Sequence, residues 1–102
     1  MAVFTITKDN IQDEVIHSRQ TVLMDFWAPW CGPCRMLSPV VDQVAGEAPD
    51  IKVVKVNIDQ EPELAAQFGI MSIPTLVVIK EGREARRSVG ALPKAEILAL
   101  LK

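Results

Sequence analysis

The sequence predicts an α/β protein, a three-layer α/β/α sandwich in which a mixed sheet of five strands lies between layers formed by four helices. Two observations support this prediction. Apolar runs typical of strands alternate along the chain with segments whose apolar residues recur at helical spacing. The chain of 102 residues, 49% of them apolar, has no repeat, low-complexity tract or flexible linker. We therefore expect residues 1–102 to form a single domain.

The first half of the chain predicts two strand–helix pairs. Residues 2–6 are expected to form a short strand and residues 9–17 a helix with its apolar side chains on one side. Residues 22–27 are apolar on both faces except for Asp25, which is typical of a central strand covered by helices on each side. Apolar residues at helical spacing then predict a long helix over residues 32–47.

The second half predicts a strand, a short helix, a pair of strands and a final helix. These elements are expected at residues 51–58, 62–69, 75–79, 84–89 and from about Pro93 onward. Pro62 suits the first position of a helix, and Gly69 suits the left-handed residue that follows a helix end. Glu81 and Gly82 predict the turn between the paired strands.

Charge and hydropathy argue against nucleic acid and membrane surfaces as targets. The net charge is -2, and the charged residues are scattered without a block of Lys and Arg. The first eight residues lack the basic region and long apolar run of a signal peptide, and no apolar stretch is long enough to span a bilayer. We expect a cytoplasmic monomer, although a processed form carrying an added Met would read the same way.

Two cysteines, Cys31 and Cys34, flank Gly32 and Pro33 at the predicted start of the long helix. Positions three apart on a helix lie on one side, so the two sulfurs can meet. Free backbone N–H groups and a partial positive charge at the helix start lower a thiol pKa, which makes Cys31 the expected nucleophile. Cys34 shares a helical stripe with apolar residues and is expected to be buried. The pattern predicts an exposed attacking cysteine and a sheltered resolving one.

A C-x-x-C pair is also typical of a zinc half-site or of an inert pair. As a structural crosslink, so short a loop contributes only about 2 kcal/mol. Zinc prefers four protein ligands, or three and a water, and the only histidine, His17, lies on a different predicted element. We expect no metal site within one chain, while a metal shared between two chains stays open. The position after a buried strand and at a helix start favours a redox pair.

Asp25 is the one carboxylate in a strand that should be covered on both faces. Burial raises the pKa of a carboxyl, and an acid that titrates near neutrality can accept the proton of Cys34. The alternative is a carboxylate paired with a neighbour. Lys55 shares a strand face with Ile51 and Val53, so its ammonium is expected near Asp25, where it would moderate the shift. Alternatively, its stem covers apolar surface and its charge lies in water.

Residues 25–35, with the sequence DFWAPWCGPCR, resemble the active-site segment of the thioredoxin family. The likeness continues in family order through Pro39, residues 54–59, Gly69-Ile70, residues 73–76, Gly82 and residues 89–91. It covers nearly the whole chain. The resemblance implies the thioredoxin fold, with the last strands antiparallel to the others.

The resemblance also implies a substrate site. An X-Pro bond can be cis at modest cost, although most are trans. By resemblance, the Ile73-Pro74 bond is cis and faces the dithiol, and Ile73 offers its backbone to a substrate strand. Trp30, Gly90 and Ala91 would line a shallow apolar surface that receives protein substrates. Met71-Ser72 departs from an Arg-Gly pair that is frequent in the family, which makes the groove less basic here.

The activity implied by the resemblance is protein-disulfide reduction, in the role of a general cellular electron donor for redox homeostasis. Gly32-Pro33 is similar to the reducing members, whereas oxidases and isomerases commonly carry a histidine there. The implied partners are disulfide-containing proteins and thioredoxin reductase, which holds the FAD and draws on NADPH, so this chain is expected to bind no cofactor. An oxidase or isomerase, and a binding module without redox turnover, are the alternatives.

Overall fold

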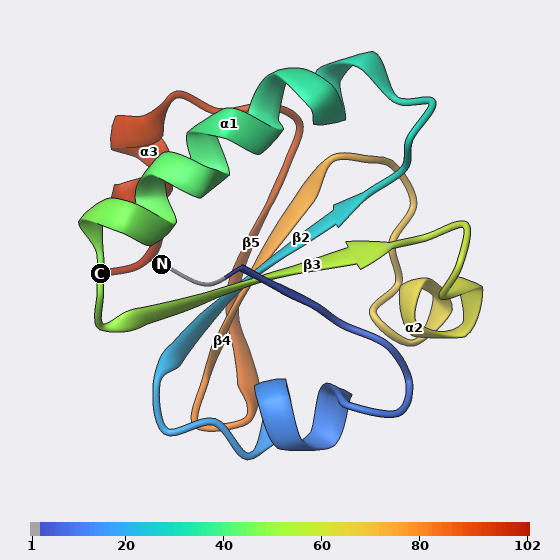
Figure 1. Cartoon of the computed structure of the whole chain (residues 1–102), viewed down its shortest axis with the longest axis horizontal. Coiled ribbons are helices and arrows are strands. Elements are labelled where there is room, and N and C mark those ends of the chain that lie inside the picture. Colours follow the sequence, from blue (N-terminus) through green and yellow to red (C-terminus); the bar gives the residue numbers. More distant parts are fainter. Residues whose placement is uncertain (1–2) are drawn as a thin grey trace.

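The computed structural model describes residues 3–102, and within them the predicted strands and helices are present (Figure 1). In chain order they are β1 (Val3–Thr5), the π-helix η1 (Gln12–Ile16), β2 (Thr21–Trp27), α1 (Gly32–Glu47), β3 (Ile51–Asn57), α2 (Pro62–Gln67), β4 (Thr75–Lys80), β5 (Arg83–Val89) and α3 (Lys94–Leu100). Most bounds lie within two residues of those expected, and residue 2 of the expected first strand lies outside the described residues. No helix in residues 3–102 is long and apolar enough to cross a membrane.

The five strands form one sheet in the order β1-β3-β2-β4-β5. β1 and β2 each pair with β3 in parallel, β4 is antiparallel to β2, and β5 is antiparallel to β4. Consequently β4 alone runs against the other strands, and the expectation that the last strands both do so is wrong for β5. The physical reason is the two-residue turn at Glu81 and Gly82, whose φ values of 53° and 77° suit a tight hairpin that reverses the chain again.

The predicted three-layer arrangement is confirmed, with a hydrophobic core on each face of the sheet. On one face, α1 and α3 bury Leu37, Val41 and Ile97 against the strands. On the other face, η1 and α2 contribute Val15 and Leu64. In Figure 1, α1 and α3 lie together above the sheet, while the blue helix η1 lies below it. The sheet is thus covered on both faces, as the apolar central strand predicts.

The helix expected over residues 9–17 is the one element that differs clearly in extent. Only Ile11 and the five residues of η1 are helical, and His17 N–H donates to Gln12 O at 2.8 Å in the π pattern. The side chain of Asn10 accepts from Thr7 N–H at 2.8 Å and donates to Thr5 O at 2.9 Å. These side-chain bonds hold residues 8–10 in a turn before the helix.

The sheet topology brings distant segments to one edge. β2 and β3 end at the same edge because they are parallel, and β4 begins there because it is antiparallel to β2. β5 ends there as well, since Thr75 pairs with Val89. The loop before α1, the loop after β3, the segment before β4 and the segment after β5 are therefore neighbours.

Candidate active site

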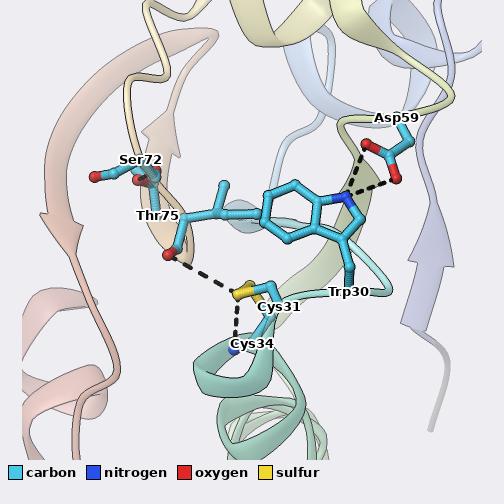
Figure 2. The surroundings of a disulfide bond; sticks show 7 residues. Trp30, Cys31, Cys34, Asp59, Ser72 and Thr75 are labelled. Atoms are coloured by element: carbon cyan, nitrogen blue, oxygen red, sulfur yellow. Dashed lines mark hydrogen bonds between the residues drawn. A yellow bond between two sulfur atoms is a disulfide. The ribbon is translucent and has the colours of Figure 1, made fainter.

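Cys31 and Cys34 lie at the start of α1 and are joined by a disulfide (Figure 2). Their Cα atoms are 5.2 Å apart. Cys31 is the extended residue that caps the helix, and its Sγ accepts the backbone N–H of Cys34 at 3.2 Å. Gly32 and Pro33 form the first turn, where proline is tolerated because its missing N–H has no partner inside the helix. The first sulfur therefore lies at the positive end of the helix dipole.

The two cysteines differ less in exposure than the sequence predicts. Cys34 is 2% exposed, as expected, but Cys31 is only 5% exposed, so the expectation of an exposed attacking cysteine is wrong for the disulfide form. Ile73 packs against the pair, and its carbonyl oxygen lies 4.0 Å from Cys31 Sγ. This cover comes from the segment before β4, whose position beside Cys31 cannot be inferred from the Cys-Gly-Pro-Cys motif alone.

The segment before β4 supplies the residues that the resemblance assigned to substrate binding. The Ile73–Pro74 peptide bond is cis. Pro74 O accepts the backbone N–H of Gly90 at 2.8 Å, which ties the end of β5 to this loop. Ala91, the next residue, is exposed. The structure thus brings Ile73, Pro74, Gly90 and Ala91 to the edge of the sheet that holds the dithiol.

Exposed apolar side chains lie next to the site along the chain. Trp30, directly before Cys31, is 67% exposed, and Met71, two residues before Ile73, is 95% exposed. The Trp30 indole N–H is held by the carboxylate of Asp59, with Nε1 at 3.2 and 3.0 Å from its two oxygens (Figure 2). Asp59 follows β3 and was not anticipated as a site residue. Because β2 and β3 are parallel, the residues that follow the two strands lie at the same edge of the sheet, which would have indicated that Asp59 lies near Trp30.

Asp25 lies in the middle of β2, directly opposite Lys55 of β3 and Leu76 of β4. It is 1% exposed, and its Oδ1 is buried without a hydrogen-bond partner among the described residues. Burial raises the pKa of Asp25 from 3.8 to about 6; the positive charge of Lys55 lowers it and the negative charge of Asp42 raises it. The carboxyl therefore changes charge near neutrality.

A cavity of about 170 Å³ connects the buried carboxyl with the second cysteine. Its lining is made by Asp25, Trp27, Cys34, Arg35, Ser38 and Lys55. Cys34 lines this cavity and Cys31 does not. The chemical asymmetry of the pair is therefore one of surroundings: Cys31 meets the helix start and the Ile73 carbonyl, whereas Cys34 meets the space beside Asp25.

Lys55 lies beside Asp25 but directs its ammonium elsewhere. Nζ donates to Ser38 Oγ at 2.5 Å and forms an ion pair with Asp42 Oδ1 at 3.1 Å. Among residues 3–102, no ion pair joins Lys55 to Asp25. Neither Ser38 nor Asp42 was anticipated as a site residue. Their spacing of four residues from each other and from Cys34 places all three on one helix face, which is a signal present in the sequence.

Within the described part of the chain, no group of three or more His, Cys, Asp or Glu residues is placed to hold a metal ion. His17 follows η1, at the residue that ends that helix.

Comparison with known proteins shows which protein family this sequence matches. A family sequence model described as thioredoxin matches residues 2–102. "Thioredoxin" of Pyropia yezoensis is 50% identical over 102 residues, covering 99% of this chain and 95% of that protein. "Thioredoxin 1" of Synechococcus elongatus is 52% identical over 93 residues, with coverage of 90% and 87%. "Thioredoxin M-type, chloroplastic" of Chlamydomonas reinhardtii is 49% identical over 94 residues, with coverage of 91% and 67%.

The raised pKa of Asp25 predicts a pH-dependent stability. Between the ordinary pKa of 3.8 and the native value of about 6, the folded protein binds more protons than the unfolded chain. The free energy of unfolding therefore falls as the pH rises through this window, by about 3 kcal/mol in total. In Asp25→Asn this loss is absent. Urea unfolding of the oxidised proteins should show the variant gaining about 3 kcal/mol relative to wild type between about pH 3.5 and about pH 7.5.

The matched control is Asp13→Asn, a substitution of an exposed carboxylate on η1. Its stability relative to wild type should stay constant within about 0.5 kcal/mol over the same range. A flat difference for Asp25→Asn as well would show that the buried carboxyl keeps its ordinary pKa.

Proposed function

The chain belongs to the thioredoxin family and is a thiol–disulfide oxidoreductase, and we propose that it works as a protein-disulfide reductase. The observation that carries this proposal is the disulfide at the start of α1, with Cys31 at the helix end and Cys34 beside the cavity of Asp25. In the proposed role, the reduced dithiol supplies electrons to cellular proteins and contributes to redox homeostasis.

In the first step, Cys31 of the reduced protein attacks a substrate disulfide as its thiolate. The helix start and the N–H of Cys34 stabilise this negative charge and so favour the thiolate over the thiol. A bond forms between Cys31 Sγ and one substrate sulfur, the substrate S–S bond breaks, and the other substrate sulfur leaves as a thiolate. The product is a mixed disulfide between protein and substrate.

In the second step, Cys34 releases the substrate. Its thiol gives a proton to the Asp25 carboxylate through the cavity that both residues line. The Cys34 thiolate then attacks Cys31 Sγ, the mixed disulfide breaks, and the second substrate sulfur leaves. The substrate has gained two electrons, and the protein holds the Cys31–Cys34 disulfide. Because Asp25 has a pKa of about 6, it can accept and return this proton near neutrality.

Substrates are proposed to bind over the edge of the sheet that holds the dithiol. The backbone of Ile73, whose carbonyl oxygen lies 4.0 Å from Cys31 Sγ, is proposed to pair with an extended substrate strand, with Pro74 beside it. Trp30 offers a large exposed apolar face, held in place by Asp59. Gly90 and Ala91 complete the surface at the end of β5.

The surroundings of Cys31 favour the reducing direction. A disulfide is a strong oxidant when its thiolate form is strongly stabilised. Among the described residues, the hydrogen bond to Cys31 Sγ comes from one backbone amide, and the only histidine, His17, follows η1, outside the active-site segment. Modest stabilisation of the thiolate supports a low reduction potential, in agreement with the Gly32-Pro33 sequence between the cysteines.

Turnover needs a reductant for the Cys31–Cys34 disulfide. We propose that thioredoxin reductase supplies two electrons from NADPH through its own FAD, so that the cofactors belong to the partner and this chain carries only the dithiol. The proposed location is the cytoplasm, where reducing conditions keep such dithiols reduced. The chain is proposed to act as a monomer.

Trapping tests the roles of the two cysteines. Cys34→Ser should attack a substrate disulfide normally and then stop, because no second thiol can release the substrate. A covalent adduct that is cleaved by added dithiothreitol should accumulate, visible by non-reducing electrophoresis and mass spectrometry. Cys31→Ser should form no adduct and reduce no disulfide. Adducts through Cys34 in Cys31→Ser, with none in Cys34→Ser, would reverse the assignment.

The reduction potential tests the direction. Equilibration with glutathione buffers, followed by thiol alkylation, should give a potential more negative than that of the glutathione couple. The same protein should support insulin reduction in an assay coupled to NADPH and a thioredoxin reductase. A potential less negative than that of glutathione, together with no coupled turnover, would identify an oxidase or isomerase instead.

A further inference from the structure

Resting on the proposed role of Asp25, we propose that Ser38 and Asp42 are positioning residues that hold the Lys55 ammonium away from the Asp25 carboxyl. In this arrangement the carboxyl stays free to take the proton of Cys34. The three residues Ser38, Asp42 and Lys55 are called the lysine clamp below.

Lys55 has two carboxylates within reach of one flexible side chain. Asp25 and Lys55 are register partners on adjacent parallel strands, and both lie on the face of the sheet covered by α1. The side chain of Lys55 therefore starts directly beside Asp25. Asp42 reaches the same region from α1. Which carboxylate the ammonium pairs with is set by the groups around it.

The clamp favours Asp42. Lys55 Nζ lies 2.5 Å from Ser38 Oγ and 3.1 Å from Asp42 Oδ1, so two contacts fix it on the helix side. Ser38 and Asp42 are four residues apart, one helical turn, and their side chains converge on one point. An ion pair near the surface contributes little to stability. The ion pair between Lys55 and Asp42 instead determines where the positive charge of Lys55 lies.

The position of the Lys55 positive charge affects the pKa of the buried Asp25 carboxyl. The ionisable groups that face Asp25 are Lys55 from β3 and Cys34, Arg35 and Asp42 from α1, while β4 presents the apolar Leu76. With Lys55 clamped, Asp25 Oδ1 has no hydrogen-bond partner among the described residues, and the cavity lies between it and Cys34.

Release of Lys55 would change the chemistry of this carboxyl. A direct ion pair favours the ionised form and typically lowers a carboxyl pKa by about 1–3. Asp25 would then be a weaker base toward Cys34, and its oxygens would be occupied by the ammonium. The clamp is thus inferred to keep Asp25 both uncharged at mildly acidic pH and accessible to the thiol.

The test is a ¹³C NMR titration of the Asp25 carboxyl in the oxidised full-length protein. Ser38→Ala combined with Asp42→Asn should lower its pKa by at least about one pH unit, a tenfold loss of proton affinity. In a Lys55→Met background, the same two substitutions should lower it less than half as far, since only the direct effect of the Asp42 charge remains. Gln43→Ala, an exposed neighbour on α1, should leave it unchanged.

An unchanged Asp25 pKa in the double variant, or an equal fall in the Lys55→Met background, would overturn the clamp. The titration uses no substrate and no free thiol, so it is independent of the proposed function. If Asp25 did not take the proton of Cys34, substrate release would be equally fast in Asp25→Asn while the clamp result would stand.

Discussion

The burial of one carboxyl, that of Asp25, is the constraint on which the rest of the site depends. A central strand covered on both faces has no water to solvate a charge, so the pKa of this group rises to about 6. The same burial weakens the folded state above that pH. The carboxyl kept at this cost in stability lines the same cavity as Cys34, which supports the proposal that it serves Cys34 as a base. In this proposal, the carboxyl that serves the reaction also lowers the free energy of unfolding at neutral pH.

The sheet topology turns this buried group into part of a directed site. Because β2 and β3 are parallel and β4 runs against them, the helix start with Cys31, the Asp59 carboxylate and the Ile73–Pro74 segment all meet at one edge. Cys31 then lies beside the Ile73 carbonyl, and Cys34 lies beside the cavity that Asp25 also lines. The difference between the two sulfurs is electrostatic and positional, since their exposed fractions are similar in the disulfide form.

Much of the fold could be predicted from the sequence because its strands and long helix carry strong periodic patterns. The direction of β5 and the short length of η1 could not, since they depend on one tight turn and on side-chain bonds of Asn10. At the site, the motif was enough to bring Cys31, Cys34 and Asp25 into consideration. Asp59, Ser38 and Asp42 were missed because their contacts with Trp30 and Lys55 join elements far apart in the chain. The position of Ile73 beside Cys31 is also a contact between distant segments, and it was expected only from the family resemblance.

The central claim is that Asp25 receives the proton of Cys34 when the mixed disulfide is resolved. The most direct measurement starts from a mixed disulfide between Cys31 and a chromophoric thiol, and follows release of that thiol by Cys34 as a function of pH. In the wild type, the rate should rise with an inflection near the Asp25 pKa of about 6. In Asp25→Asn, the release should be slower by about a hundredfold at neutral pH, and this inflection should be absent. An equal rate with an unchanged pH profile in Asp25→Asn would contradict the claim.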